Sequence, residues 1–260
     1  MGERGLAADG IMDFAGRVAI VTGGTRGLGA GVARRLAAAG FAVHVCGRSQ
    51  PETGPQGIRF SAVDVRDAEA ARAFVDSVAS AHGRLDLLVN NAGGSPQASA
   101  LASRPRFADA ILRLNLLAPL YMAQAAHPHM RASGGGSIVN IASVSAIRPS
   151  PGTAVYGAAK AGLVSLTQSL AQEWGPDGIR VNAIIAGLMA TETAGETYGD
   201  ATAQAAVAAS MPLGRMGTGE DIAGAVLWLA SGLSGWVSGA RINVDGGGER
   251  PYFLDLVKGG

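Results

Sequence analysis

The sequence predicts an α/β protein in which one doubly wound, seven-stranded parallel sheet is flanked by helices. Short apolar runs rich in β-branched residues alternate with stretches of helical spacing along the whole chain. The apolar runs are nearly continuous, as expected for strands that are covered on both faces. No repeat or linker divides the 260 residues. We therefore expect one domain over 14–248, a flexible leader at 1–13 and a tail at 249–260.

The order of the elements follows from this alternation. Seven segments are expected to form strands, namely 17–22, 41–46, 58–63, 85–90, 137–142, 179–184 and 240–244. Five segments carry apolar residues at three- and four-residue steps and are expected to form helices, namely 29–39, 68–81, 106–130, 153–174 and 220–230. Strand and helix alternate from end to end, which favours a doubly wound sheet.

Two connections interrupt the alternation. The stretch 49–57, between the second and third strands, contains two prolines and two glycines, so we expect no crossover helix there. The stretch 189–217, between the sixth and seventh strands, is long and alanine-rich. Insertions of this length are often lids or binding loops, although a surface helix pair without a role is an alternative. We expect a substrate loop that closes over the pocket.

Composition and charge exclude several classes of protein. Hydrophobic residues make up 48% of the chain and charged residues 16%, which is unlike a disordered chain or a coiled coil. The net charge is +1 with both signs interspersed, so we expect no nucleic-acid or membrane partner. Cys46 is the single cysteine and cannot form an intramolecular disulfide. We expect a cytoplasmic protein.

The first expected strand runs directly into a glycine-rich turn, Thr22-Gly-Gly-Thr-Arg-Gly-Leu-Gly29. Glycines let the backbone approach a pyrophosphate closely, and the start of the following helix offers unpaired N–H groups to it. The position after the first strand of a βαβ unit makes this signal much stronger than three glycines alone. The residues expected to bind a dinucleotide here are Gly23, Thr25, Arg26, Gly27, Leu28 and Gly29.

This Thr-Gly-x-x-x-Gly-x-Gly spacing resembles that of the classical short-chain dehydrogenase/reductase family, and the likeness extends over about residues 16–248. Asp64-Val65 ends the third strand, where the family holds the adenine. Asn90-Asn-Ala-Gly93 ends the fourth, where the family supports the cofactor, here through Asn91, Ala92 and Gly93. The resemblance implies a Rossmann-type fold, a nicotinamide cofactor, a small carbonyl or alcohol substrate and a homotetramer.

A Tyr-x-x-x-Lys pair, Tyr156 and Lys160, lies near the start of the fifth helical segment, and residues four apart share one helix face. The resemblance implies an active site that these two form with Ser143 and Asn115. Tyr156 would be the general acid in carbonyl reduction or the base in alcohol oxidation. Lys160 would lower the pKa of that tyrosine and bind the ribose hydroxyls. Ser143 would bind the substrate oxygen, and Asn115 would hold a water molecule.

The end of the second strand predicts a preference for NADP(H). Enzymes that select NAD place a carboxylate about twenty residues past the glycine loop, where Gly47 stands here. Arg48 follows it, and Arg26 lies in the loop itself. NADP-preferring members of the family use both positions for the 2′-phosphate, which a guanidinium can hold by two charge-assisted bonds.

The remaining pocket residues are expected after the fourth, fifth and sixth strands. Gly187, Met189 and Thr191 match the family's nicotinamide contacts, although Ala186 replaces the usual proline. The residues expected to contact the substrate are Gly94, Ser95, Ser143, Ser145, Leu188 and Tyr198, with Val144 and Arg148 beside them.

Other functions remain open at this point. A 3-oxoacyl-(acyl-carrier-protein) reductase is the nearest broad likeness, but Gly134 and Asp177 stand where a basic docking patch would lie. A non-catalytic dinucleotide-binding protein is a further alternative, and an extended-branch epimerase or dehydratase is disfavoured by the chain length. We expect no metal site, because a helix end before Pro128 explains the pair His127 and His129.

The tail carries an apolar cluster with no core of its own, namely Tyr252, Phe253, Leu254, Leu256 and Val257. Such a patch commonly marks an interaction surface. We expect it to lie in an interface of the tetramer, with packing onto the same subunit as the alternative.

Overall fold

A computed structural model describes residues 13–50, 57–251 and 257 of the chain. One seven-stranded sheet has the order β3-β2-β1-β4-β5-β6-β7, and every neighbouring pair is parallel. The strands are β1 (Val18–Thr22), β2 (Ala42–Gly47), β3 (Ile58–Ala62), β4 (Leu87–Asn90), β5 (Gly136–Ser143), β6 (Ile179–Ala186) and β7 (Arg241–Val244). The strand order reverses between β1 and β4, which confirms the doubly wound sheet.

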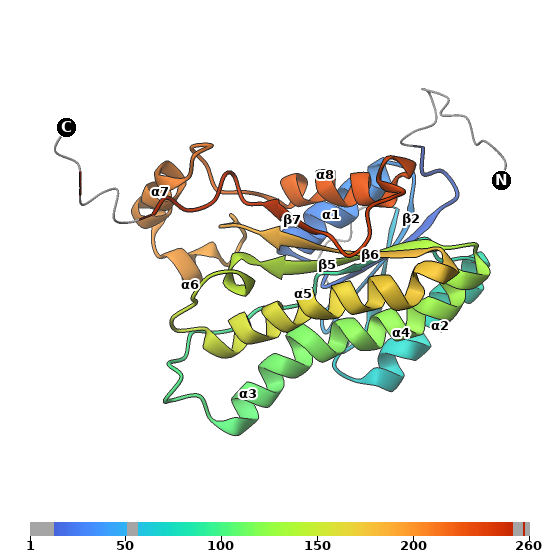
Figure 1. The fold of residues 1–260 in the computed structure, drawn as a ribbon, viewed down its shortest axis with the longest axis horizontal. Coiled ribbons are helices and arrows are strands. Elements are labelled where there is room, and N and C mark those ends of the chain that lie inside the picture. Colours follow the sequence, from blue (N-terminus) through green and yellow to red (C-terminus); the bar gives the residue numbers. More distant parts are fainter. Residues whose placement is uncertain (1–12, 51–56, 252–256, 258–260) are drawn as a thin grey trace.

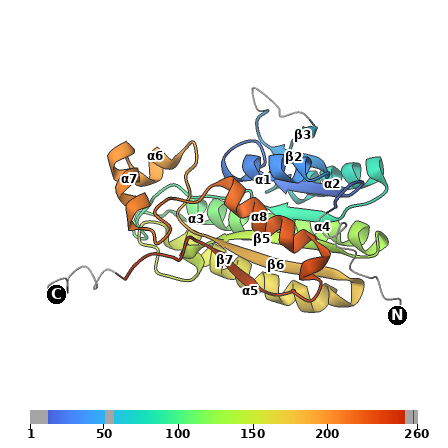
Figure 2. The same cartoon turned by 90° about the horizontal axis from the view of Figure 1, so that it is seen from above.

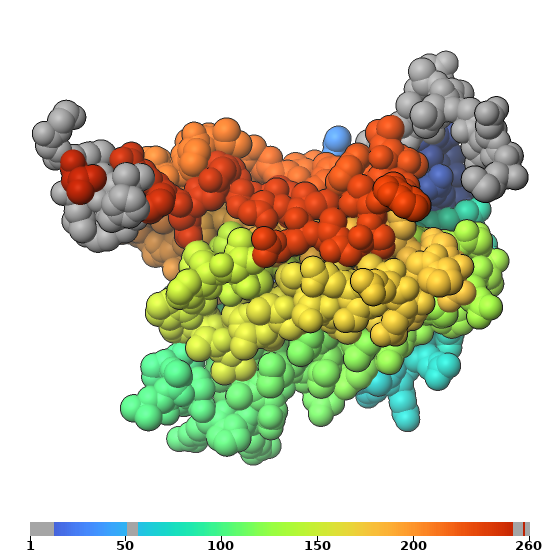
Figure 3. All heavy atoms as spheres, in the orientation of Figure 1, coloured from blue at the N-terminus to red at the C-terminus, as the bar shows by residue number. Residues whose placement is uncertain are grey.

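Helices cover both faces of this sheet (Figures 1 and 2). On one face, α1 and α8 pack on a core that includes Val21 and Val139, and on the other face α2, α4 and α5 pack on Ile20 and Ile138. Figure 3 shows α4 and α5 lying side by side on the outer surface. The helices are α1 (Gly27–Ala38), α2 (Ala68–His82), α3 (Pro105–Leu112), α4 (Ala118–Ala132), α5 (Ala154–Trp174), α6 (Ala194–Tyr198), α7 (Ala201–Ser210) and α8 (Gly219–Ala230).

Local sequence signals set the ends of several helices. Asp67 caps α2, since its carboxylate accepts from the N–H of Glu69 at 2.9 Å and of Ala70 at 3.1 Å. Gly83 ends the same helix at φ 69°, a left-handed conformation that glycine adopts without strain. At the start of α8, Thr218 and Asp221 form a reciprocal capping box.

The predicted strands and most helices lie within two residues of their expected positions, but the segment 106–130 differs. It forms α3, a π-helical turn (Arg113–Leu117) and α4 in succession. The expected helix end before Pro128 is wrong, because α4 continues to Ala132. The following turn is fixed by burial of Met130 and by a 2.6 Å hydrogen bond between His129 and Asp76, which offset the backbone bond that proline removes.

The two connections that interrupt the strand–helix alternation, 49–57 and 189–217, differ in structure. No helix separates β2 from β3 within residues 48–50 and 57, the described part of that connection. The segment 189–217 contains α6 and α7, which stand apart from the layered body in Figure 2. No residue of α7 is buried.

Most residues of the expected leader and tail are not described by the structure. Residues 1–12 of the leader expected at 1–13, and the tail residues Tyr252, Phe253, Leu254 and Leu256, lie outside the described residues. Among the described helices, none is long and apolar enough to cross a membrane.

A histidine pair beside the edge strand predicts acid sensitivity. The Nε2 atoms of His44 on β2 and His82 on α2 are 2.9 Å apart, and burial, His82 and Arg59 lower the pKa of His44 to about 4. An unfolded histidine titrates at about 6.5. Between these two pH values, His44 is protonated in the unfolded chain but neutral in the folded chain. The free energy of unfolding therefore decreases as the pH falls from 6.5 towards 4. We expect the melting temperature to fall between pH 7 and pH 5, and His44→Gln to flatten this slope. An identical slope in the variant would contradict the assignment.

Candidate active site

A cavity of about 700 Å³ lies at the carboxyl ends of the central strands. Its size is within the usual range of ligand pockets, and it lies where open α/β sheets bind ligands, at the reversal of strand order. The expected cofactor contacts that line it are Gly23, Thr25, Arg26, Gly27, Leu28, Arg48, Asp64, Val65, Asn91, Ala92, Gly93, Tyr156, Lys160, Gly187, Met189 and Thr191. Almost all residues that the sequence predicts as cofactor contacts thus line one cavity.

Gly29 is the exception in the glycine turn. It is buried and does not line the cavity. A Cβ atom added to Gly29 would lie 2.4 Å from both Asn91 Nδ2 and Gly23 O. Glycine is therefore required for close packing of the helix start against the glycine turn and Asn91, and the expected cofactor contact of Gly29 stays a prediction.

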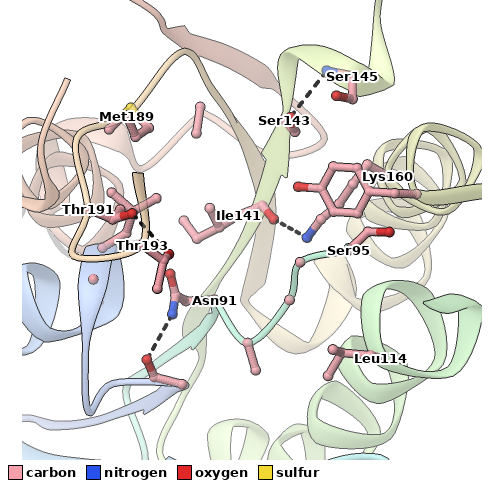
Figure 4. A pocket seen from close by; sticks show the side chains of 18 of the residues that line it. Asn91, Ser95, Leu114, Ile141, Ser143, Ser145, Lys160, Met189, Thr191 and Thr193 are labelled. Carbon is pink, nitrogen blue, oxygen red and sulfur yellow. Dashed lines mark hydrogen bonds between the residues drawn. The ribbon is translucent and has the colours of Figure 1, made fainter. Parts of the chain in front are cut away.

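The ends of β1 and β4 are joined by hydrogen bonds that support the floor of the cavity. The hydroxyl of Thr22 accepts from the N–H groups of Asn91 at 3.0 Å and Ala92 at 2.9 Å. The Asn91 side chain donates to Thr22 O at 2.9 Å and to Gly23 O at 3.2 Å. Asn91 therefore holds the glycine turn in place (Figure 4).

Charged groups gather at the β2–β3 end of the cavity. Arg26 and Arg48 line it with exposed side chains. The guanidinium of Arg66 lies 2.5 Å from Asp64 and keeps the pKa of that carboxyl below its usual range. Arg66 was missed by sequence reasoning, although its position two residues after Asp64 was the available signal. Gly47 supplies no carboxylate at this end.

The cavity is also lined by Tyr156 and Lys160, both on α5. Figure 4 shows Lys160 beside Ile141. The ammonium of Lys160 donates to Ile141 O at 2.7 Å and lies 5.7 Å from the centre of the Tyr156 ring. Lys160 is 3% exposed, and burial lowers its pKa to about 8. Helical spacing has brought both groups to one place, as expected.

Ser143 ends β5 beside Tyr156. Its hydroxyl accepts from Ser145 N at 3.2 Å, and a hydrogen bond with Tyr156 favours the phenolate. Burial outweighs that bond and raises the pKa of Tyr156, with a smaller contribution from Tyr198. The expectation that Lys160, together with the positive nicotinamide ring, lowers this pKa stays a prediction for the cofactor complex, since burial opposes charge on both side chains here.

Asn115 lies beneath the cavity rather than on its wall. It is fully buried in the π-helical turn, which presents its amide to the backbone after β4. Its Oδ1 accepts from Gly94 N at 2.9 Å, and its Nδ2 donates to Gly94 O at 2.9 Å and Ile111 O at 3.0 Å. The structure thus assigns Asn115 to holding Gly94, a contact that the expected water-binding role did not include.

The expected substrate residues Gly94, Ser95, Ser143, Ser145, Leu188 and Tyr198 all line the cavity, as do Val144 and Arg148. The hydroxyl of Tyr198 accepts from Met189 N at 3.4 Å. Arg148 is paired with Glu249, whose Oε1 accepts from Nη2 at 2.7 Å. The charge of Arg148 in the cavity wall is therefore paired with that of Glu249.

Two further polar residues were not predicted from the sequence, one in the cavity wall and one buried in the central sheet. Glu192 lines it and accepts a hydrogen bond from Gly27 N at 2.9 Å. Asn140 on β5 lies opposite Asn90 on β4, accepts from it at 2.9 Å, and donates to Thr167 on α5 at 2.9 Å. An asparagine at the same register of two central apolar strands was a usable signal. No local sequence pattern indicated a role for Glu192.

The histidine and cysteine side chains in the described part of the chain do not form a metal site or a reactive thiol. No group of three or more His, Cys, Asp or Glu side chains is placed to hold a metal ion there. His127 bonds to Asp177 at 2.9 Å and His129 to Asp76 at 2.6 Å, so each has an acidic partner. Cys46 is buried on β2, and burial raises the pKa of its thiol to about 12.

Known proteins resemble this chain over nearly its whole length. A family model described as Enoyl-(Acyl carrier protein) reductase matches residues 23–249. The chain is 37% identical over 240 residues to 2-dehydro-3-deoxy-D-gluconate 5-dehydrogenase of Escherichia coli strain K12, covering 89% of this chain and 95% of that protein. It is 37% identical over 244 residues to 7alpha-hydroxysteroid dehydrogenase of Clostridium sardiniense, covering 89% and 93%. The ligand-free structure of Thermoplasma acidophilum aldohexose dehydrogenase matches with a TM-score of 0.86 at 28% identity, covering 92% of this chain and 96% of that one.

Proposed function

The chain belongs to the classical short-chain dehydrogenase/reductase family, and we propose that it is an NADP-dependent enzyme that interconverts a ketone or aldehyde and an alcohol. Members of this family are oxidoreductases that use a nicotinamide dinucleotide. The observation that carries the proposal is the placement of Tyr156, hydrogen-bonded to Ser143, in the cavity that the glycine turn also lines.

The residues around the cavity suit a dinucleotide. A Cβ atom added to Gly27 would lie 3.6 Å from Glu192 Oε2 and 3.7 Å from Thr191 Cγ2, so any residue other than glycine would narrow the space over the turn. The start of α1 offers N–H groups to a pyrophosphate. Arg26, Arg48 and Asp64 would hold the adenosine end, and Lys160 and Thr191 the nicotinamide end.

The bound cofactor supplies the hydride, and the protein supplies position and the proton. Ser143 would bind the carbonyl oxygen beside Tyr156. Because burial raises the pKa of Tyr156, its phenol carries a proton at neutral pH and can donate it to the developing alkoxide. In the oxidative direction the same hydroxyl would accept the proton of the alcohol. The buried Lys160 would contribute positive charge beneath the nicotinamide ribose.

The test of this function is NADPH oxidation with a panel of ketones and aldehydes. Turnover of any panel member, lost in a Tyr156→Phe variant, would support the proposal. NADPH binding with no turnover across the panel would favour the alternative, a non-catalytic dinucleotide-binding protein. An acyl-thioester panel member addresses the 3-oxoacyl carrier-protein reductase alternative.

The cofactor preference is a separate prediction. We expect kcat/KM with NADPH to exceed that with NADH by at least about tenfold, since charge-assisted bonds contribute about 1.5–3 kcal/mol each. Gly47→Asp combined with Arg48→Ala should move the ratio towards NADH. A Cβ atom at Gly47 would have Thr25 as its nearest neighbour at 3.4 Å, so the aspartate has room.

Arg34→Ala is the matched control for this ratio, because Arg34 is exposed on α1 and does not line the cavity. It should leave the ratio unchanged. Equal efficiency of the wild-type protein with both cofactors would refute the assignment of Arg26 and Arg48.

The segment 189–217 completes the proposed site. It contributes Met189, Thr191 and Tyr198 to the cavity wall. We propose that it closes over the bound substrate, which would exclude water from the hydride transfer.

A further inference from the structure

The N-terminus of α1 is occupied by a carboxylate from a distant part of the chain. The N–H of Gly27 donates to Glu192 Oε2 at 2.9 Å, although the two residues are 165 positions apart. The helix has no acidic residue in its own first turn, and Arg26 makes no side-chain cap. Glu192 therefore supplies the negative charge that a helix N-terminus favours.

The segment that carries Glu192 lies directly over the glycine turn. A Cβ atom added to Gly27 would be 3.6 Å from Glu192 Oε2 and 3.7 Å from Thr191 Cγ2. Thr191 and Thr193 extend into the same cavity from this segment (Figure 4). The position of Glu192 thus results from the fold of the segment that follows β6, immediately before α6.

A carboxylate here takes the place that a pyrophosphate would need. One N–H group cannot donate a full-strength hydrogen bond to two anions at once. In addition, the negative charge of a carboxylate would repel a pyrophosphate bound beside it. Glu192 is exposed, so it can turn into water without leaving a buried charge behind. The contact is therefore suited to being broken when an anion arrives.

We propose that Glu192 is an internal competitor for the cofactor pyrophosphate. It fastens the start of the 189–217 segment to α1 in the free protein, and a dinucleotide must displace it. Cofactor binding thereby frees Glu192 from α1, while Thr191 of the same segment would hold the nicotinamide end. The inference rests on the proposed function only in requiring that a dinucleotide binds over the glycine turn.

The first test is the affinity of Glu192→Gln for NADPH, measured by calorimetry at low ionic strength. We expect the dissociation constant to fall about three- to tenfold, because the variant loses an anion from the helix N-terminus and its repulsion of the pyrophosphate. Adenosine 2′-monophosphate, which has no pyrophosphate, should bind the variant and the wild type equally. Hydrogen exchange in 189–199 of the free variant should be faster than in the wild type.

Glu196→Gln is the matched control, since Glu196 is an exposed carboxylate of α6 in the same segment. It should leave both affinities unchanged. Equal or weaker NADPH binding by Glu192→Gln would overturn the inference while the proposed function stands. A gain shared by adenosine 2′-monophosphate would also overturn it, because the effect would then be general electrostatics. If the wild-type protein bound neither NADPH nor NADH, the proposed function would fail and this inference with it.

Discussion

Replacing Tyr156 with phenylalanine is expected to lower kcat by about 10²- to 10⁴-fold or more, while the dissociation constant for NADPH stays nearly unchanged. The ring keeps its packing on α5, and only the hydroxyl is lost. That hydroxyl is hydrogen-bonded to Ser143 and holds its proton at neutral pH because burial raises its pKa. No other phenol takes its place, since the Tyr198 hydroxyl lies in a different segment and accepts from Met189 N.

Steady-state kinetics and NADPH titration together distinguish a lost proton donor from a lost binding site. Tyr121→Phe is the matched control, because Tyr121 packs against the core under the sheet and does not line the cavity. It should retain nearly full activity. A Tyr156→Phe variant with more than about a tenth of the wild-type kcat would refute the assignment of Tyr156 as the acid.

Gly93→Ala is expected to lower kcat/KM by about 10²-fold, the loss that a displacement of catalytic groups by about 1 Å produces. The added methyl group would lie 2.8 Å from Asn115 Oδ1 and 3.1 Å from Lys160 Nζ. The distance to Asn115 is shorter than a methyl group can approach and the distance to Lys160 is tight, so the local structure must shift. Asn115 is held by three hydrogen bonds to backbone, so the Gly93 backbone must give way, which shifts the cavity wall beside Lys160.

Gly224→Ala serves as the control for an added methyl group. Gly224 lies in α8, and a Cβ atom there would meet nothing within 4 Å. This change should leave kcat/KM unaltered, and it should not lower the melting temperature, since alanine favours helix over glycine. Gly93→Ala with wild-type kinetics would show that the close contact around Asn115 and Lys160 has no catalytic consequence.

The central strands were predictable because each is covered on both faces and must be apolar along its length, whereas the edge strands β3 and β7 are only partly buried. All five residues of β1 are buried, and its sequence reads as one apolar run to Thr22. The cavity was predictable for a related reason. The carboxyl ends of parallel strands lie at the same edge of the sheet, so the residues just after β1, β4, β5 and β6 lie close together.

The missed features depend on contacts that no local pattern carries. Pro128 signals a helix end by itself, but Met130 and the acidic partners of the neighbouring histidines hold the helix together. The π-helical turn that buries Asn115 likewise depends on backbone contacts with Gly94, which is distant in the sequence. Glu192 reaches Gly27 only because β6 and β1 belong to one folded sheet.

The environment of Cys46 makes the intact chain suitable for site-specific fluorescent labelling. Maleimides react with the thiolate, and a buried thiol whose pKa is raised to about 12 presents almost none at neutral pH. Because Cys46 is the single cysteine, a thiol introduced by Ala201→Cys at the exposed start of α7 would be the one that accepts the dye. A dye at that position would test in real time whether the 189–217 segment closes, without removal of any native side chain around the cavity.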